Sequence, residues 1–285
     1  MNLCAGLDRL GVQYGVNDYG RLGQSPTEIA CVLGKPHVLA RIPRATPIVL
    51  GPAMYSHPVD APNLFAQHDI RGLLVPCEWM RQMCEPEWGT KVQVWPVGID
   101  TEGWVPQEKT SKDIDVLVYD KIRWQREEYG PLLDAISRHL NSTKLATRTV
   151  RYGFYRENDF RDLVSRSRAM IYLCEHETQG IALLQTLSSD VPVFAWDRRG
   201  YWQDPKYFPS RVKFAPVTTV PYWDDRCGAT FGDATEFDRG FSSFWQSVHG
   251  GRFSPRSYVV EHLTLEKGAR HYLDIVDSVS ASSSQ

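Results

Sequence analysis

The sequence predicts an α/β protein with parallel sheets in two domains, and three observations support this fold class. Ala169–Cys174 and Pro192–Trp196 are apolar runs of strand length, and Gly180–Leu187 between them carries apolar residues at helical spacing. Two consecutive strands joined through a helix form a βαβ unit, so these strands should be parallel. Strand-like and helical segments also alternate on both sides of a polar stretch, Glu102–Asp113, which we interpret as the linker between the domains.

The first hundred residues predict a small domain of short strands and helices. Leucines recur at helical spacing over Met1–Leu10, and Ser25-Pro-Thr-Glu28 is a capping box that should start a helix reaching Leu33. The expected later elements are strands over Val12–Val16, His37–Ala40, Pro47–Leu50 and Gly72–Val75, a helix within Val75–Arg81 and a strand from Val92. A Rossmann-like domain begins with a strand and a Gly-rich loop before its first helix, and neither is present. Either the native start lies upstream, or this domain lacks its first strand.

The second half of the chain alternates strands and helices in the order that another parallel sheet requires. Beside the βαβ unit, we expect strand Asp115–Tyr119, helix Tyr129–His139, strand Thr149–Phe154, helix Glu157–Arg166, strand Val212–Ala215, helix Asp233–Val248, and helices Pro255–His262 and Leu265–Val279. Asp233 or Thr235 should cap the helix that begins there. The predicted organisation is a first domain over 1–108, a second over 109–254, closing helices over 255–279 and a disordered polar tail over 280–285.

Composition excludes several classes of function. The 285 residues include 32 basic and 34 acidic ones, so no basic field points to nucleic acid. No apolar run is long enough to span a bilayer, and the N-terminus lacks the basic region and apolar core of a signal peptide. Six scattered cysteines form no C-x-x-C pair, which is typical of a reducing compartment. We expect a cytoplasmic protein with no nucleic-acid partner and at most peripheral contact with the inner face of the membrane.

Several catalytic signatures are missing from the sequence. It has no paired acids of a hydrolase, no Gly-x-Ser-x-Gly elbow and no phosphate loop ending in Gly-Lys-Ser/Thr. Asp113-Ile-Asp115 starts a strand and is interpreted as its polar edge, not as a pair of metal ligands. We therefore expect neither a metal ion nor a cofactor.

A polar cluster follows the strand Ala169–Cys174, at the end where open α/β sheets bind ligands. The cluster comprises Glu177, Thr178, Gln179 and Gly180. Backbone N–H groups at the start of the next helix suit an anion or a ring of hydroxyl groups. Gln185 follows Glu177 by eight residues, at most about 12 Å along a helix, and a nucleotide sugar spans a similar distance from hexose to ribose. An ordinary polar loop with an exposed Glu and a surface Gln explains the same residues, so both interpretations stay open.

Basic residues follow the first expected strand of the second domain. Lys121, Arg123 and Arg126 lie beyond its carboxyl end, where charge-assisted hydrogen bonds suit a diphosphate. A solvated basic loop is the alternative. The presence of Glu177 and Gln185 in the same domain favours the binding site.

His57 is a further candidate residue. It lies in a Gly- and Pro-rich loop that follows the expected strand Pro47–Leu50, again beyond a carboxyl end. A solvated loop histidine is the alternative interpretation.

The stretch that begins at Glu177 resembles the Glu-x7-Glu signature of the large retaining family of GT-B glycosyltransferases. Glu177, Gly180 and Val191-Pro-Val193 fit this signature. Gln185 stands where the family has its second Glu, and Asp190 stands where it has a Gly. Glutamine still donates and accepts hydrogen bonds to a ribose, without the charge.

A second segment carries the same resemblance. Pro96-Val-Gly-Ile-Asp100 is similar to the Pro-x-Gly-Val-Asp that ends the first domain in that family, and the resemblance extends from about Val75 to the C-terminus. It implies a GT-B-like fold in which two Rossmann-like domains face a cleft, the first domain being small or truncated. It also implies that the last helices pack back toward the first domain.

The resemblance implies roles for the candidate residues, with Glu177 as the catalytic group and His57 as the candidate on the acceptor side. The donor sugar is bound by Glu177, Thr178, Gln179 and Gly180. The diphosphate is bound by Lys121, Arg126 and Gly180, with Arg123 as an alternative. The ribose is bound by Gln185, and the base by Tyr152, Gly153 and Phe154.

The implied function is transfer of a hexose from a UDP-, GDP- or ADP-sugar to a carbohydrate, lipid-linked or small-molecule acceptor. By resemblance the reaction needs no metal, retains the anomeric configuration and serves cell-surface polysaccharide biosynthesis. Because Gln185 and Asp190 depart from the signature, a non-catalytic nucleotide-sugar- or carbohydrate-binding partner subunit is the alternative. An unrelated doubly wound ligand-binding protein is a third.

Overall fold

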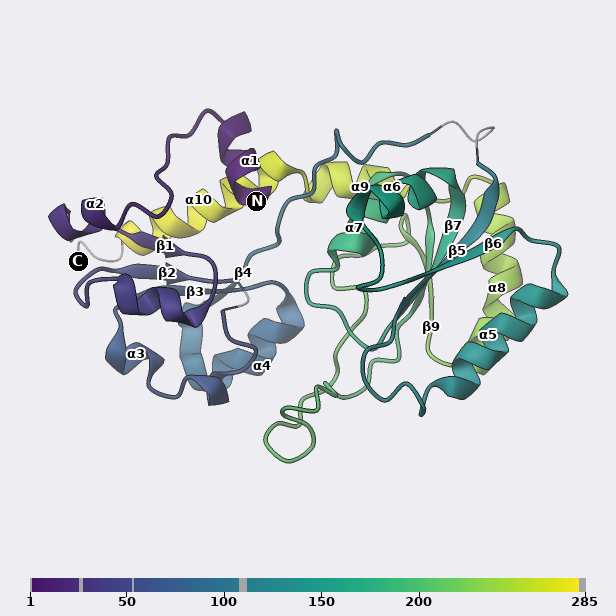
Figure 1. Cartoon of the computed structure of the whole chain (residues 1–285), viewed down its shortest axis with the longest axis horizontal. Coiled ribbons are helices and arrows are strands. Elements are labelled where there is room, and N and C mark those ends of the chain that lie inside the picture. Colours follow the sequence, from purple (N-terminus) through teal and green to yellow (C-terminus); the bar gives the residue numbers. More distant parts are fainter. Residues whose placement is uncertain (1, 26–27, 53, 108–111, 282–285) are drawn as a thin grey trace. The chain divides into compact units, whose positions relative to one another are not determined.

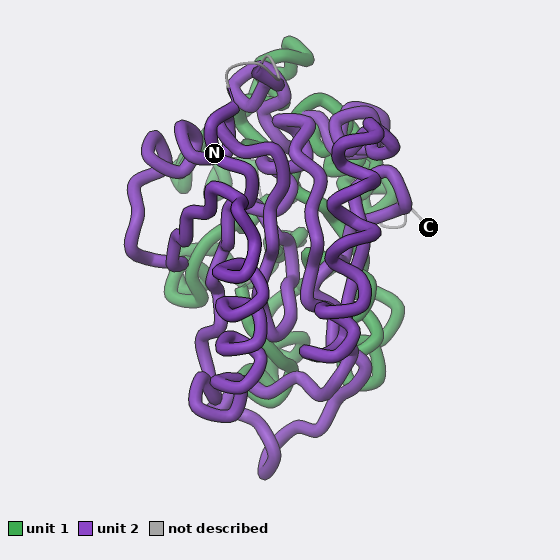
Figure 2. Tube along the Cα trace, turned by 90° about the vertical axis from the view of Figure 1, so that its right-hand side faces the viewer, with its two compact units in different colours: residues 1–98, 265–285 green, residues 99–264 purple. Residues whose placement is uncertain are grey.

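The computed structural model describes residues 2–25, 28–52, 54–107 and 112–281. They form two compact units: unit 1 consists of residues 1–98 and 265–285, and unit 2 of residues 99–264 (Figure 2). Each unit is built on one parallel sheet (Figure 1). The predicted class of two parallel-sheet α/β domains is confirmed.

The sheet of unit 1 has four parallel strands in the order β1-β2-β3-β4. The strands are β1 (Ala30–Val32), β2 (Ile48–Leu50), β3 (Ile70–Val75) and β4 (Val92–Val94). The helices are α1 (Asn2–Arg9), α2 (Tyr19–Gln24), α3 (Leu64–Gln67), α4 (Glu78–Trp88) and α10 (Leu265–Ala281), with 3-10 helices η1 (Pro36–Arg41), η2 (Pro58–Asp60) and η3 (Gly89–Lys91). Figure 1 shows α1 and α10 on one face of this sheet and α3 and α4 on the other.

The C-terminal helix completes the core of unit 1. In α10, buried Ala269 and Tyr272 belong to the same apolar cluster as Leu7 of α1 and Trp95. The indole Nε1 of Trp95 donates a hydrogen bond of 2.8 Å to the carbonyl oxygen of Gly268. The Trp95 and Tyr272 rings meet edge to face, with centroids 5.0 Å apart. The two ends of the chain therefore fold into one unit.

Two expected strands of unit 1 are wrong. Val12–Val16 pairs with no described strand: Gly11 has a φ of +69°, and the Val16 side chain is 62% exposed. His37–Ala40 lies in η1, because Pro36 at its first position lacks a sheet donor and presets a helical φ.

The helix expected over residues 25–33 is also wrong. Its last part is strand β1, whose residues are buried, exposed and buried in turn. Residues 26–27 of the capping box lie outside the described part of the chain. The helix in this region is α2, which begins earlier because the Asp18 carboxylate accepts the N–H of Arg21.

The remaining expectations for unit 1 agree with the structure, apart from the C-terminal tail. The strands near Pro47 and Gly72, the following helix and the strand from Val92 are confirmed as β2, β3, α4 and β4. Helix α10 continues through Ser280 and Ala281, so the expected disordered tail is wrong there, and residues 282–285 lie outside the described residues.

The sheet of unit 2 has five parallel strands in the order β6-β5-β7-β8-β9. The strands are β5 (Ile114–Lys121), β6 (Thr147–Arg151), β7 (Ser167–Cys174), β8 (Val193–Trp196) and β9 (Gly228–Phe231). The helices are α5 (Gly130–Ser142), α6 (Glu157–Arg166), α7 (Ile181–Ser188), α8 (Ala234–His249) and α9 (Pro255–His262). Figure 1 shows α5 and α8 on one face and α6, α7 and α9 on the other.

Alternate residues of the central strands face the two helix layers. In β7, Met170 and Tyr172 pack with residues of α6, α7 and α9, whereas Ile171 and Leu173 pack with residues of α5 and α8. Because both faces are covered, these strands are apolar almost throughout, as doubly wound parallel sheets require. The neighbouring strands β5 and β7 end together, with Lys121 opposite Cys174.

One predicted strand of unit 2 is wrong and one strand was not expected. Val212–Ala215 is not a strand, and the edge strand is β9 instead. Its first residue, Gly228, has a φ of +143°, and a glycine at the start of a four-residue strand gives a weak sequence signal. The other elements expected after Glu102 are present, and Asp233 caps α8 by accepting the N–H of Glu236 at 2.8 Å.

The units divide between Gly98 and Ile99, whereas the sequence led us to expect a boundary near residue 108. The two closing helices also separate, because α9 lies in unit 2 and α10 in unit 1.

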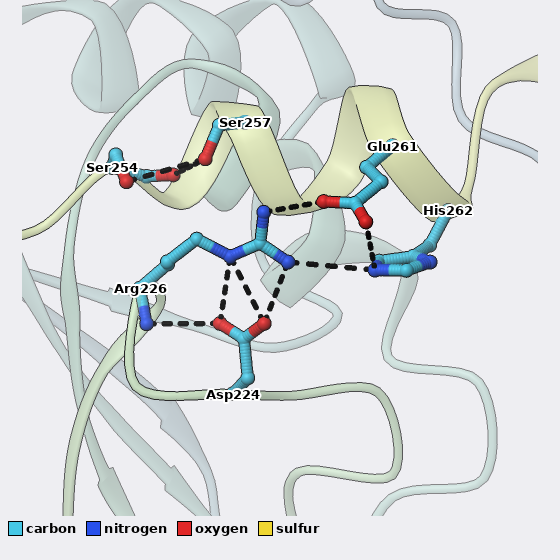
Figure 3. A network of polar contacts seen from close by, with 6 residues as sticks. All are labelled: Asp224, Arg226, Ser254, Ser257, Glu261 and His262. Carbon is cyan, nitrogen blue, oxygen red and sulfur yellow. Dashed lines mark hydrogen bonds and ion pairs between the residues drawn. The ribbon is translucent and has the colours of Figure 1, made fainter.

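An ion-pair network fixes α9 to the segment before β9 (Figure 3). Arg226 contacts the Asp224 carboxylate at 2.7 Å and the Glu261 carboxylate at 2.6 Å. The hydrogen bond from Arg226 lowers the pKa of Asp224. The guanidinium also lies over the ring of Tyr258, 5.4 Å from its centroid. Partly exposed ion pairs of this kind each contribute less than about 1 kcal/mol to stability. We therefore infer that the network mainly orients α9.

Gly228→Ala should destabilise unit 2 by about 3 kcal/mol or more, because the new Cβ would collide with the backbone of Val193 in β8. Gly153→Ala is the matched control, since Gly153 also has a positive φ but has open space around its Cβ position. We expect a cost of about 1–2 kcal/mol there. Urea unfolding measures both free energies, and equal costs would contradict the close approach of β8 and β9.

Candidate functional site

The candidate site lies at the carboxyl edge of the unit 2 sheet, where β5 and β7 end side by side. Lys121 is the last residue of β5, and residues 175–180 connect β7 to α7. The pairing of β5 with β7 brings the basic segment and the polar cluster of the sequence together.

Glu177 is buried and held by three donors. Lys121 Nζ lies 2.5 Å from Glu177 Oε2, and the Tyr172 hydroxyl donates to the same oxygen at 2.7 Å. The N–H of Thr178 donates to Glu177 Oε1 at 3.2 Å. The backbone of Glu177 is fixed as well, because its N–H donates to the carbonyl oxygen of Thr218 at 2.9 Å. The carboxylate therefore has a defined orientation.

The electrostatics keep this pair charged. Burial opposes ionisation of Glu177, but the charge and hydrogen bond of Lys121 and the Tyr172 hydroxyl outweigh it, so the pKa of Glu177 is lowered. Burial likewise opposes the charge of Lys121, and the Glu177 carboxylate outweighs it, so the pKa of Lys121 is raised. Burial and the Glu177 charge raise the pKa of Tyr172, which keeps its hydroxyl a donor.

A tight turn brings Glu177 to the start of α7. Gly180, which precedes α7, has a φ of +70°, a left-handed conformation that favours glycine. A Cβ at Gly180 would lie 3.0 Å from Glu177 Cγ, so the turn is closely packed against the glutamate side chain. Gln185 lies half-buried on the same helix.

Glu175 organises the loop after β5. Its Oε1 accepts the N–H groups of Arg123 and Trp124, both at 2.8 Å. The Trp124 ring stacks on His176 with centroids 5.1 Å apart. Burial is the largest cause that lowers the pKa of His176, to about 3, and nearby cations including Arg198 act in the same direction. His176 is therefore neutral at physiological pH.

The three basic candidates have different surroundings. Arg126 makes a bidentate ion pair with buried Asp120, with Nη1 3.0 Å from Oδ1 and Nη2 2.7 Å from Oδ2. Arg123 is exposed, and its guanidinium lies 5.9 Å from the centroid of the Tyr152 ring. Lys121 Nζ lies 4.7 Å from the same centroid. The structure thus brings Lys121, Arg123 and Tyr152 together, while Asp120 holds Arg126.

The candidates for the nucleoside base follow β6 in a turn. Tyr152 and Phe154 are exposed, at 44% and 78%. Gly153 between them has a φ of +83° and open space around its Cβ position. Two exposed aromatic rings at a strand end offer faces for stacking.

His57 belongs to unit 1 and is buried, so the solvated-loop interpretation is wrong. Its Nδ1 accepts the N–H of Val59 at 3.1 Å and so starts η2. A place on the acceptor side stays a prediction for this residue.

Sequence reasoning missed three residues of the site. Tyr172 looks like an ordinary core residue of β7, and only the fold of the following loop brings Glu177 to its hydroxyl. Arg198 follows β8 and adds a cation close to Glu175 and His176. Asp197 is buried beside it and accepts the N–H of Thr219 at 3.0 Å. The signal for the last two was their position directly after an expected strand.

The part of the chain that the structure describes contains no group of three or more His, Cys, Asp or Glu side chains placed to hold a metal ion. Within the same residues, no helix combines the length and apolar character needed to cross a membrane.

Comparison with known proteins gives similarity in structure but not in sequence. The sequence matches no family model and no curated protein. A glycosyltransferase from Rickettsia africae ESF-5 is similar over 97% of this chain and 87% of its own, with a TM-score of 0.60 and 10% identity. AviGT4, a glycosyltransferase involved in avilamycin A biosynthesis, is similar over 99% of this chain and 88% of its own, with a TM-score of 0.57 and 12% identity.

A third similar structure, that of accessory secretory proteins 1, 2 and 3 in Streptococcus pneumoniae, matches 93% of this chain and 56% of its own, with a TM-score of 0.57 and 14% identity. These likenesses establish a glycosyltransferase fold of the GT-B type. They establish the fold alone, because identity is 10–14%.

Lys121→Met should lower the free energy of unfolding by about 3 kcal/mol at pH 7, because it leaves the Glu177 charge buried without its cation. The lowered pKa of Glu177 contributes stability above its unfolded pKa of about 4.3, and the raised pKa of Lys121 contributes below about 10.4. Without Lys121 the pKa of Glu177 rises. The deficit relative to the wild type should therefore shrink as the pH falls from about 8 to 5.

Urea unfolding over that pH range measures the deficit. The double variant Lys121→Met/Glu177→Gln is the control and should recover most of the loss. A deficit that does not change with pH would contradict the buried ion pair.

Proposed function

We propose that this protein is a glycosyltransferase that moves a hexose from a nucleoside-diphosphate donor to an acceptor hydroxyl group. The observation that carries the proposal is the buried, ionised Glu177 beside the cations at the end of β5, in a fold of the GT-B type. A fixed carboxylate next to cations at one sheet edge suits a ligand with a sugar at one end and a diphosphate at the other.

Donor binding would use the residues around this carboxylate. The diphosphate lies against Lys121 and Arg123 and the N-terminus of α7 at Gly180, with Arg126 contributing when it is released from Asp120. The sugar of the donor contacts Glu177, Thr178 and Gln179, and its ribose contacts Gln185. Its base contacts Tyr152, Gly153 and Phe154. The donor is a UDP-, GDP- or ADP-sugar.

The proposed step breaks the bond between the anomeric carbon and the diphosphate oxygen and forms a bond from that carbon to the acceptor oxygen. The acceptor proton passes to the departing phosphate oxygen, so that a nucleoside diphosphate and a glycoside are the products. The anomeric configuration is retained. Cationic side chains neutralise the leaving group, so the proposed reaction needs neither a metal nor another cofactor.

The acceptor is a carbohydrate, a lipid-linked molecule or another small molecule, and His57 of unit 1 is the candidate on its side. Such a transfer fits the biosynthesis of cell-surface polysaccharides. The cytoplasm is the proposed setting, because none of the six cysteines forms a disulfide. Peripheral contact with the inner face of the membrane belongs to the same proposal.

A non-catalytic partner subunit is the second candidate. Lys121 already neutralises Glu177, and Gln185 replaces the acid expected for the ribose. The likeness to accessory secretory proteins is compatible with this role. Nucleotide binding without turnover, in a panel of labelled UDP-, GDP- and ADP-sugars, distinguishes it from the enzyme.

Glu177→Gln should reduce transfer or donor hydrolysis in that panel by at least about 100-fold, because the negative charge beside the sugar is lost. Glu177→Ala should abolish it. Nucleoside diphosphate affinity should not fall in Glu177→Gln, because the diphosphate contacts remain and Lys121 no longer pairs with a carboxylate. Radiolabel transfer and calorimetry measure the two effects, and full activity in either variant would remove Glu177 from the reaction.

Arg123→Ala should weaken UDP or GDP binding by about tenfold, equal to about 1.4 kcal/mol. Because Arg123 is exposed, stability should not change. Combined Lys121→Ala and Arg126→Ala should weaken binding further. Arg239→Ala on the exposed side of α8 is the control. Equal affinity of the Arg123 and Arg239 variants in calorimetry would refute the diphosphate assignment.

A further inference from the structure

The segment between β8 and β9 is the longest stretch of unit 2 without a helix or strand. It comprises residues 197–227, and we refer to it as the β8–β9 segment. Figure 1 shows it leaving the carboxyl edge of the sheet as a long loop, drawn in green. Loops longer than about 12–15 residues without secondary structure are uncommon inside compact domains and are usually functional.

The base of this segment is fastened to the candidate site. Asp197, which leaves β8, accepts the Thr218 hydroxyl and the Thr219 N–H, both at 3.0 Å. The carbonyl oxygen of Thr218 accepts the N–H of Glu177 at 2.9 Å. The Thr219 hydroxyl donates to the carbonyl oxygen of Cys174 at 2.9 Å. Residues 198–217 therefore leave and return beside Glu177, and we refer to them as the excursion.

The excursion has a small core of its own. Trp202 and Tyr207 are buried, and their rings stack with centroids 4.7 Å apart. The Trp202 N–H donates to the carbonyl oxygen of Phe214 at 2.8 Å, which closes the excursion across its width. Tyr129 of unit 2 donates from its hydroxyl to Gln203 at 2.8 Å. The segment is thus held in one shape.

The charge of the excursion departs from that of the chain. Residues 198–213, which we refer to as the basic stretch, contain one acidic residue, Asp204, and five basic residues. The basic residues are Arg198, Arg199, Lys206, Arg211 and Lys213. All except the half-buried Arg198 are exposed. The whole chain has a net charge of −2, so this is a local positive surface on a slightly acidic protein.

We propose that the basic stretch binds an acceptor that is a polyanion, a polymer with repeating phosphate groups, and presents it to Glu177. This inference rests on the proposed glycosyl transfer, since it names the acceptor class of the same site. Several exposed cations on one loop can engage successive phosphate groups, and the base of this loop is hydrogen-bonded to the backbone of Glu177.

A membrane surface fits these observations less well. Membrane-binding elements expose apolar anchors beside their cations. Here the aromatic rings Trp202 and Tyr207 are turned inward, and Tyr201, 49% exposed, is the single large apolar side chain of the basic stretch that is exposed.

The test uses the full chain and sodium polyphosphate as the probe, with neutral dextran as the uncharged comparison. The loop variant is Lys206→Gln/Arg211→Gln/Lys213→Gln, which keeps polar side chains at three exposed positions. The control variant Arg138→Gln/Arg239→Gln/Arg252→Gln removes the same charge at exposed positions elsewhere in unit 2. A second loop variant, Lys206→Arg/Arg211→Lys/Lys213→Arg, keeps the charge and changes the side chains.

The loop variant should bind polyphosphate at least about tenfold more weakly at low salt. The slope of log affinity against log salt concentration should fall by about 2, since each lost phosphate contact removes about 0.7–0.9. The control variant and the charge-keeping variant should bind like the wild type, and all should bind UDP or GDP alike. The nucleotide titration tests the proposed function, whereas the polyphosphate titration tests this inference.

Three results would overturn the inference. If the protein bound polyphosphate no more tightly than dextran, the basic stretch would not be an anion site. If the loop and control variants lost polyphosphate affinity equally, the effect would be one of net charge. Binding to phosphatidylcholine vesicles that contain phosphatidylglycerol, without binding to polyphosphate, would assign the surface to a membrane.

Discussion

The buried ion pair between Lys121 and Glu177 is the interaction on which the candidate site depends. Each charge would be costly alone at this depth, so each fixes the other in position and in its charged state. The pair also joins the end of β5 to the loop after β7, across 56 residues of the chain. A nucleoside diphosphate would compete for Lys121 and so release the Glu177 carboxylate for the hydroxyl groups of a sugar. The resting pair is therefore compatible with both a donor-activated enzyme and a binding subunit.

The doubly wound sheet makes this pair possible. β5 and β7 are parallel neighbours, and both faces of each strand are buried under helices, so their polar residues gather where the strands end. β8 ends at the same edge and contributes Asp197 and Arg198. Tyr172 connects the core to the site, because its ring stacks on Tyr119 with centroids 5.1 Å apart while its hydroxyl reaches Glu177.

The sequence predicted the fold class and most helices and strands of unit 2, but not the contacts among the candidate residues. The bounds of α6 and α9 agree with the prediction, since acidic residues open α6 and Pro255 opens α9. β9 was missed because its glycine and short length resemble a turn, and η1 was mistaken for a strand because apolar residues follow Pro36. No local pattern shows that Asp120 holds Arg126, or that the β8–β9 segment returns to Glu177, since both contacts depend on tertiary pairing.

The central claim is that a nucleoside diphosphate binds where β5 and β7 end in unit 2. A crystal structure of the full chain soaked with UDP or GDP tests it most directly. Our account predicts diphosphate density within hydrogen-bonding distance of Lys121 and Arg123 and at the first N–H groups of α7. It also predicts that Lys121 turns from Glu177 toward the phosphate. Diphosphate density at the amino ends of these strands or in unit 1, with the Lys121–Glu177 pair intact, would contradict the account.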